Sequence, residues 1–389
     1  MQLLDNPIQP YAWGSHTAIP ELLGVEPSGK PQAELWMGAH PAAPSRISGT
    51  STSLVDLIAA DPAGELGAAC LAEFGPSLPF LMKVLAAGDP LSLQAHPDPV
   101  QAKEGYEREN ADGIPLDAPH RNYKDPSAKP EMICALTPIE ALMGFRPPAE
   151  TLAVADALGV AALDPLLAVL REQPDGEGLR AVFTLLMTAP ADQQRSVVAA
   201  VLDACRVRQD ELETARLVVR LAERYPGDPG VVAAILLDHV HLAPGEAAYL
   251  PPGNLHAYLE GVGVELLANS DNVLRGGLTT KHVDLPELLR VLDFTPGSTR
   301  ILTVDADGDF DTPAPQFRLA RLEVAGGTEI TLAPAGPQIL LCVEGNVVAR
   351  SELGKVGLTR GHSAYAGARE GVVSLAGEGT VFRATSGLR

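Results

Sequence analysis

A block of helix-like sequence separates two β-rich segments, and this arrangement limits the folds open to the chain. Short apolar runs broken by proline and glycine extend to about residue 146. From residue 148 to about 230, alanine, leucine and valine recur at the three- and four-residue spacings typical of amphipathic helices. Strand-like sequence returns after the proline- and glycine-rich break at Pro226–Gly230. We therefore expect a mainly β fold with a helical insertion.

The pattern also predicts where the parts of the fold begin and end. Helices are expected over Thr151–Val169, Gly178–Thr188, Ala191–Val207 and Gln209–Arg224. After about Arg300, short β-branched runs alternate with glycine-rich turns, as in a small antiparallel sandwich or barrel. The predicted division is a β domain formed by 1–147 and 231–299, a helical domain at 148–230 and a second β domain at 300–389. A length of 389 residues suits two or three domains.

The charge of the chain argues against two classes of partner. Lys and Arg number 29 and Asp and Glu number 49, which gives a formal charge of −20. Such a surface repels polyphosphate and anionic lipid, so we expect neither a nucleic-acid nor a membrane partner. No apolar run approaches the roughly 20 residues of a membrane span, and no secretory signal is evident. Four widely spaced cysteines without a CxxC pair predict buried free thiols and a cytoplasmic protein.

Two short segments carry side chains suited to a metal ion. If the Gln94-x-His96 segment is a strand, both side chains point to one face, where a carboxamide oxygen and an imidazole could meet one ion. The pair could equally be a satisfied polar pair. In Lys129-Pro130-Glu131, the acid and the base lie on one side of the chain as it enters the apolar run Met132–Leu136. That arrangement predicts either a buried ion pair or a functional site.

A third segment, His256–His282, contains more polar residues than packing requires. Polar side chains interrupt a strand-like pattern, which indicates a polar cavity, although composition also allows a solvated loop. The charged or amide residues are Glu265, Asp271, Asn272, Arg275 and Lys281.

Together and in this order, these motifs resemble the signatures of type I mannose-6-phosphate isomerases. The resemblance extends to Tyr11-x-Trp13-Gly14-Ser15, Glu34–Gly38 and Phe80–Leu85, and it covers most of residues 1–300. It implies a cupin-type jelly-roll catalytic domain interrupted by helices, followed by a second, C-terminal jelly-roll domain.

The resemblance also implies a set of functional residues. One zinc ion per chain would be held by Gln94, His96, Glu131 and His256. The catalytic residues would be Arg275, Lys129 and Glu265, with the identity of the base open between Lys129 and Glu265. The substrate-binding residues would be Ser92 and Lys83 near the sugar phosphate, Lys281 in the cavity, and Trp13, which has no defined role.

The implied reaction interconverts mannose 6-phosphate and fructose 6-phosphate by proton transfer between C1 and C2 through an enediol(ate). Zinc and an arginine could stabilise the oxygen charge that develops. Two alternatives stay open: an isomerase of the same fold with a different or unphosphorylated sugar, and a cupin-like sugar-binding or regulatory protein without turnover. The expected oligomeric state is a monomer or a weak homodimer.

The chain departs from the family pattern at one position that bears on the chemistry. The family commonly reads Asn-His-Lys-Pro-Glu where this chain reads Ser127-Ala128-Lys129-Pro130-Glu131. Ala128 therefore replaces a histidine that could shuttle protons or open the sugar ring. Leu267 and Thr280 are departures that packing should tolerate. His239 and His241 alternate in a predicted strand and could mimic a cupin metal pair, but they do not match the family ligands.

Overall fold

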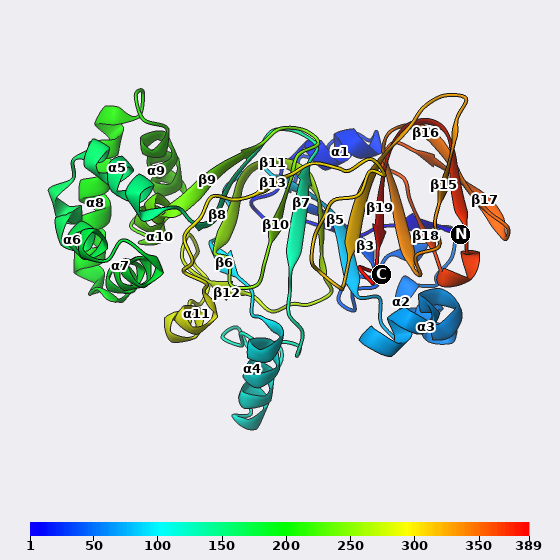
Figure 1. The fold of residues 1–389 in the computed structure, drawn as a ribbon, viewed down its shortest axis with the longest axis horizontal. Coiled ribbons are helices and arrows are strands. Elements are labelled where there is room, and N and C mark those ends of the chain that lie inside the picture. Colours follow the sequence, from blue (N-terminus) through cyan, green and yellow to red (C-terminus); the bar gives the residue numbers. More distant parts are fainter. Residues whose placement is uncertain (389) are drawn as a thin grey trace.

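The computed structural model describes residues 1–388 and contains two β-sheets and a helical lobe (Figure 1). The helical lobe lies at one end of the molecule, and the sheet that contains the chain termini lies at the other. We call this last sheet the terminal sheet and the sheet between it and the helices the central sheet. The helical insertion expected between two β-rich segments is confirmed.

The central sheet has 11 strands, ordered β13-β10-β7-β11-β5-β3-β2, with β6, β8, β9 and β12 joined to it through β11. Its strands are β2 (Ile8–Gln9), β3 (Glu34–Gly38), β5 (Phe80–Ala87), β6 (Gln94–Ala95), β7 (Glu131–Ala135), β8 (Ile139–Phe145), β9 (Leu237–Leu242), β10 (Ala247–Leu250), β11 (His256–Ala268), β12 (Leu274–Arg275) and β13 (Ile301–Leu302). Strand β5 is buried along its whole length, with Met82 and Val84 in one apolar cluster and Leu85 in another. A fully covered strand is normally apolar throughout, so Lys83 within it marks a functional position.

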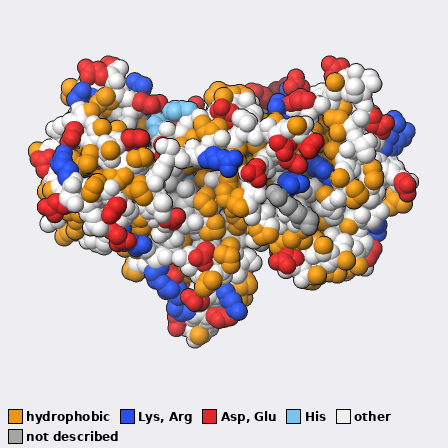
Figure 2. All heavy atoms as spheres, in the orientation of Figure 1, with side chains coloured by type: hydrophobic (Ala, Val, Ile, Leu, Met, Phe, Trp, Pro, Cys, Tyr) orange, Lys and Arg blue, Asp and Glu red, His pale blue; other side chains and the backbone are white. Residues whose placement is uncertain are grey.

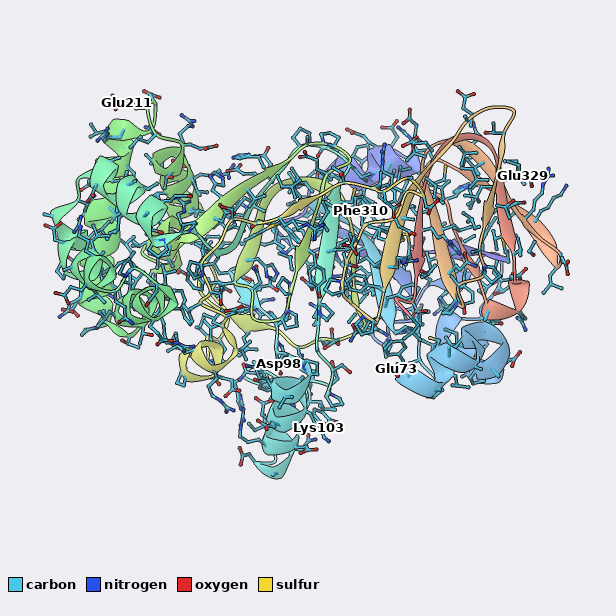
Figure 3. All side chains as sticks on the ribbon, in the orientation of Figure 1. Glu73, Asp98, Lys103, Glu211, Phe310 and Glu329 are labelled. Carbon is cyan, nitrogen blue, oxygen red and sulfur yellow. The ribbon has the colours of Figure 1, made fainter. Side chains whose placement is uncertain are left out.

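The terminal sheet joins the two ends of the chain. Its eight strands are β1 (Gln2–Asp5), β4 (Arg46–Ile47), β14 (Arg318–Val324), β15 (Glu329–Leu332), β16 (Gln338–Ser351), β17 (Gly354–Thr359), β18 (Ser363–Ala366) and β19 (Val373–Thr385). Strand β1 pairs with β18, so the first and last β segments share one sheet. Phe310 lies in the apolar cluster that joins the two sheets (Figure 3). The predicted division gives residues 1–147 to the first β domain and residues 300–389 to the second. The terminal sheet takes strands from both ranges, since β1 and β4 come from the first and its other six strands from the second.

The helical lobe comprises α5 (Pro148–Leu158), η1 (Ala161–Leu163), α6 (Asp164–Glu172), α7 (Gly176–Thr188), α8 (Ala191–Arg208), α9 (Glu213–Arg224), α10 (Gly230–Ala233) and η2 (Ala234–Leu236). The single helix expected over Thr151–Val169 is wrong, because Gly159 ends α5 in the left-handed conformation, with φ of 66°. One apolar cluster joins the lobe to Leu142 of β8 and Ala257 of β11. The lobe is therefore packed firmly on the central sheet.

The remaining helices lie around the sheets. They are α1 (Ala18–Leu23), α2 (Leu54–Ala60), α3 (Pro62–Phe74), α4 (Pro99–Ala111), α11 (Leu285–Val291) and η3 (Ala368–Glu370). Helix α4 projects from the body, and Asp98 caps its first turn together with Gln101 (Figure 3). Across residues 1–388, no helix has both the length and the apolar character that crossing a membrane requires.

Candidate active site

Strand β11 supplies two walls of one cavity and changes direction between them. Its first part pairs with β6 and β8, and its second part pairs with β5 and β7. The register shifts between Tyr258 and Glu260, and Gly261 follows with φ of 116°. A bulge adds one residue and changes the face to which later side chains point. His256 and Glu265, an odd number of positions apart, therefore both line the cavity.

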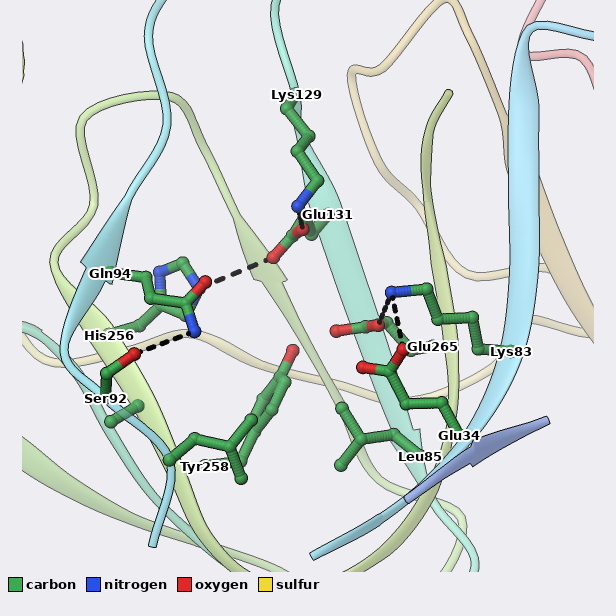
Figure 4. Close-up of a pocket in the computed structure, with 12 residues that line it drawn as sticks. Glu34, Lys83, Leu85, Ser92, Gln94, Lys129, Glu131, His256, Tyr258 and Glu265 are labelled. Carbon is green, nitrogen blue, oxygen red and sulfur yellow. Dashed lines mark hydrogen bonds and ion pairs between the residues drawn. The ribbon is translucent and has the colours of Figure 1, made fainter. Parts of the chain in front are cut away.

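The cavity is mostly polar although it lies inside the central sheet (Figure 4). Its walls come from β3, β5, β6, β7 and β11 and from the segments before β6 and β7. The lining residues are Glu34, Lys83, Leu85, Leu91, Ser92, Gln94, Lys129, Glu131, His256, Ala257, Tyr258 and Glu265.

Three side chains far apart in the sequence converge at one end of this cavity. The Nε2 atoms of His96 and His256 each lie 3.4 Å from Glu131 Oε2. One donor atom from each of the three residues lies within 4.8 Å of the others, and all three residues are buried. Two imidazoles and a carboxylate at this spacing form a donor set that suits a divalent transition-metal ion.

Backbone carbonyls turn the two imidazoles toward the shared centre. His96 Nδ1 lies 2.6 Å from the carbonyl oxygen of Asn272, and His256 Nδ1 lies 3.0 Å from that of Asn254. A hydrogen bond at Nδ1 leaves Nε2 as the donor atom for a metal. Buried His96 Nε2 has no hydrogen-bond partner within residues 1–388. Such an orphaned atom fits a position filled by a metal ion.

Burial and neighbouring charges favour the protonation states that bind metal. Burial lowers the pKa of His96 to about 4, and Lys129 acts in the same direction. Burial alone would raise the pKa of Glu131, but Lys129 and the two histidines lower it well below its usual value. The site therefore presents a neutral His96 imidazole and an ionised Glu131 carboxylate at neutral pH.

Gln94 lies beside this group. It pairs with His256 across β6 and β11 and with Arg275 across β6 and β12. Its Nε2 lies 3.2 Å from Ser92 Oγ, and its carboxamide oxygen points toward Glu131 (Figure 4). The four side chains expected to hold an ion therefore lie together at this end of the cavity.

Lys129 also lies at this end of the cavity. Its Nζ is 2.9 Å from Glu131 Oε1, while Glu131 Oε2 faces the two histidines. The Lys129–Glu131 ion pair, one of the two alternatives that the sequence left open, is present, and it orients the Glu131 carboxylate.

A buried charge triad forms the opposite wall. Lys83 Nζ lies 3.4 Å from Glu34 Oε2 and 3.3 Å from Glu265 Oε2 (Figure 4). Burial alone would lower the pKa of Lys83, but Glu34 and Glu265 raise it above its ordinary value. Burial also raises the pKa of Glu265, and Glu131 and Glu34 add to this effect while Lys83 opposes it. Lys83 therefore stays protonated. Glu265, with its raised pKa, is a stronger base than an ordinary carboxylate and suits proton transfer.

Sequence reasoning gave no role to two residues of the cavity. Glu34 belongs to the motif Glu34–Gly38, and its partner Lys83 is distant in the sequence. Tyr258 was not singled out, although it lies two positions after His256 on the same strand face. Its hydroxyl points into the cavity, and burial together with Glu265 raises its pKa well above the usual value (Figure 4). The alternation His256-x-Tyr258 was the available signal.

Neither Arg275 nor Lys281 is among the residues that line the cavity. Arg275 is half-buried on β12 next to Gln94, and burial lowers its pKa. Burial lowers the pKa of Lys281, and the charges of Arg275 and Lys124 lower it further. Like charges act on one another in this way only when they are near, so these three cations form a local positive group.

Trp13 is not among the residues that line the cavity. It is half-buried against the apolar cluster that contains Leu85 and Leu91, and its ring centroid is 5.8 Å from that of Tyr11. Its backbone oxygen accepts hydrogen bonds from Gly88 and Asp89. A contact between Trp13 and a sugar stays a prediction.

Ala128 is buried in the wall of a neighbouring hollow. His40, Lys124 and Asp271 line the same hollow, and His40 Nε2 lies 3.3 Å from Asp271 Oδ1. An imidazole is therefore present in this wall even though residue 128 is alanine.

The family of the chain follows from comparison with known proteins. A model of the phosphomannose isomerase type I catalytic domain matches residues 1–148, and a model of that family's helical insertion domain matches residues 160–237. Mannose-6-phosphate isomerase of Escherichia coli (strain K12) is 42% identical over 393 residues, covering 98% of this chain and 99% of that protein. The Homo sapiens enzyme of that name is 34% identical over 410 residues, covering 95% and 94%.

Solved structures give the same result. The crystal structure of mannose 6-phosphate isomerase from Salmonella typhimurium, bound to substrate (fructose 6-phosphate) and zinc, has a TM-score of 0.91 to this chain. The two sequences are 38% identical, and the match covers all of both chains. The chain belongs to the type I phosphomannose isomerase family.

Proposed function

We propose that the chain is a zinc-dependent mannose-6-phosphate isomerase. The observation that carries this proposal is one cavity with a metal-binding donor set at one end and the Lys83–Glu265 pair at the other. Relatives named mannose-6-phosphate isomerase match the chain over almost its full length, and a similar structure holds fructose 6-phosphate and zinc.

We assign one zinc ion to Gln94, His96, Glu131 and His256. These residues fit the ion because both imidazoles are oriented by carbonyls and His96 Nε2 is buried without a protein partner in the described chain. When bound, Zn²⁺ would polarise the sugar oxygens at C1 and C2 and stabilise the negative charge that develops there. A single anionic ligand leaves the site with net positive charge.

We assign the role of base to Glu265. The reaction removes a proton from the carbon beside the carbonyl and returns one to the neighbouring carbon, so no atom is gained or lost. Glu265 can take and return this proton because its pKa is raised and its carboxylate lies in the cavity wall. Lys83 stays protonated and holds the Glu265 carboxylate in place. Lys129 is paired with Glu131 at the metal end and is assigned the orientation of that ligand.

We assign the phosphate to the positive group beside β12. Arg275, Lys281 and Lys124 supply cations there, and Ser92 offers a hydroxyl at the adjacent wall. Lys83, which the family pattern places near the phosphate, is already paired with two carboxylates. A dianion beside Lys83 would lie next to Glu34 and Glu265, whose charges oppose it. Arg275 pairs with Gln94 across β12 and β6, so its charge also bears on the charge that develops at the sugar oxygens.

We propose a cytoplasmic location and a monomeric or weakly dimeric state. The four cysteines are all buried and free, which suits a reducing compartment. The exposed large apolar side chains are spread along the sequence, from Tyr11 to Val372.

The test combines metal analysis with a coupled isomerisation assay on phosphorylated and free sugars. The purified chain should contain zinc in the catalytic set and turn over mannose 6-phosphate far faster than mannose. His256→Ala should lose that zinc and the turnover together, while His362→Ala, at an exposed position just before β18, should keep both. Full zinc and a normal rate in His256→Ala would contradict the assignment. Turnover of the free sugar alone would favour an isomerase of different specificity, and zinc without any turnover would favour a binding protein.

A further inference from the structure

A second group of histidines and carboxylates lies where the helical lobe meets the central sheet. His239 and His241 are two positions apart on β9, and Glu213 is in the first turn of α9. One donor atom from each lies within 4.8 Å of the others. Figure 2 shows histidine side chains at the surface between the helical lobe and the body. The group combines two strand residues with one residue from the inserted helices.

This group is separate from the catalytic cavity. Ile139, Ala141 and Met143 of β8 pack with Tyr258 on the inner face, whereas Leu142 packs with the helical lobe on the other face. Glu140 shares the outer face with Leu142, because side chains alternate along a strand. Glu140 is paired with His241 across β8 and β9 and touches His239 Nε2 at 2.8 Å. The histidines therefore face the helices, away from the catalytic donor set.

The chemistry of the group favours a cation. His241 Nε2 lies 2.8 Å from Glu213 Oε1. Arg220 lies 2.7 Å from Glu140 and 3.2 Å from Glu260, so one guanidinium is set against two carboxylates. The side chains of His241 and Glu213 are 55% and 57% exposed, which leaves them room to adjust. A tetrahedral zinc ion with bonds of about 2.0–2.1 Å needs donors about 3.3 Å apart, a small closure from the present spacing.

We propose that His239, His241 and Glu213 form a second binding site for a divalent transition-metal ion such as Zn²⁺. Two imidazoles and a carboxylate are the ligands that such ions prefer, and solvent completes the coordination. Glu140 lies beside His239 and adds negative charge. Because Glu213 belongs to the lobe and the histidines to the sheet, the ion joins the helical insertion to the catalytic domain.

Occupation of this site should stabilise the folded chain without affecting catalysis. An ion that binds only the folded arrangement stabilises that arrangement, so saturation should raise the melting temperature Tm. At a Zn²⁺ concentration about 100 times the Kd, we expect a rise of about 3 °C for a chain of 389 residues. Turnover should not depend on the site, since none of its residues lines the cavity.

The experiment titrates the chelator-treated, full-length protein with Zn²⁺ and measures bound metal after removal of the excess. The wild type should bind one equivalent more than His241→Ala, and Glu213→Gln should bind that equivalent more weakly. His362→Ala is the control and should match the wild type. Because the comparison is a difference between variants, it stands whether or not the catalytic site holds zinc. Equal metal content in the wild type and His241→Ala would overturn the proposal.

A second measurement separates metal binding from a change in folding. Titration with Co²⁺ should give a d–d absorption band whose intensity falls in His241→Ala but not in His362→Ala. Zn²⁺ should raise the Tm of the wild type by more than that of His241→Ala. If the wild type and His241→Ala give the same spectrum and the same Tm response, then His239 and Glu140, and likewise His241 and Glu213, form only ion pairs.

Discussion

Lys83 and Glu265 lie directly opposite each other on β5 and β11, and Lys83 Nζ is 3.3 Å from Glu265 Oε2. Glu34 approaches the same ammonium from β3 at 3.4 Å. The carboxylates of Glu34 and Glu265 therefore share the ammonium of Lys83, whose strand β5 is otherwise apolar. Burial and the excess negative charge raise the pKa of Glu265, whereas the two carboxylates raise the pKa of Lys83 against the opposing effect of its burial.

Glu265→Gln tests the base. The amide keeps the size of the side chain and a contact with Lys83 but cannot accept the proton, so kcat should fall by about 10²–10⁴-fold. Zinc content should not change, because Glu265 is outside the donor set. Glu34→Gln is the matched control, since it removes a charge from the same ammonium and should lower kcat far less. Steady-state rates and metal analysis check the prediction, and a normal kcat in Glu265→Gln would assign the proton transfer to another group.

Lys83→Met tests what the ammonium does for the fold. Its removal leaves two buried carboxylates without their shared cation, and breaking a buried pair in this way costs about 3–5 kcal/mol of unfolding free energy. Lys103→Met at an exposed position of α4 should change stability by less than about 0.5 kcal/mol. Urea unfolding of both variants measures the difference. If the two variants are equally stable, the triad contributes nothing to the fold.

The motifs allowed much of the site to be predicted, because each contains its chemistry within a few residues. Gln94-x-His96 and Lys129-Pro130-Glu131 place their side chains together by local geometry alone. The sequence could not reveal how His256 and Glu265 come to line one cavity, since the bulge after Tyr258 changes the alternation of β11. A bulge depends on the pairing of β11 with β8, which is tertiary information.

The fold shows the same limit. Amphipathic spacing predicted the helical lobe, yet the pattern of Thr151–Val169 continued through Gly159, where the left-handed conformation ends α5. A single glycine is tolerated within a helix, so the pattern alone could not identify the break. The pairing of β1 with β18 joins segments from opposite ends of the chain, and no local pattern indicates it.

Lys281→Ala tests the phosphate assignment. Loss of one cation from the group with Arg275 and Lys124 should raise KM for mannose 6-phosphate by about tenfold, equivalent to about 1.4 kcal/mol of binding. The KM for a free sugar should stay as in the wild type. Lys355→Ala on β17, far from the cavity in the terminal sheet, is the control. Equal effects of Lys281→Ala on both sugars would remove Lys281 from the phosphate site.

Ala128→His tests whether this wall of the neighbouring hollow bears on the reaction. Residue 128 is buried beside His40 and Asp271, so a new imidazole there would add a group that titrates near neutral pH. We expect an altered pH dependence of kcat/KM, with an additional ionisation between about pH 6 and 7. Ala128→Gln has a similar size and does not titrate, so it should leave the shape of the profile unchanged. A histidine variant with the wild-type profile would place position 128 outside the reaction path.

Glu140→Gln tests the electrostatics of the second histidine group through acid stability. Burial alone would raise the pKa of Glu140, but the hydrogen bond with His239 and the contact with Arg220 lower it to about 2. A folded-state pKa below the unfolded value means that the ionised carboxylate stabilises the fold above about pH 4.5, and that this contribution disappears as the pH falls toward 2. The wild type should therefore exceed Glu140→Gln in unfolding free energy at about pH 6, and the two should converge near pH 2. Glu329→Gln, at an exposed position of β15, should follow the wild type throughout. Unfolding curves at several pH values measure this difference, and a constant gap between wild type and Glu140→Gln would mean that the carboxylate acts through packing rather than through its charge.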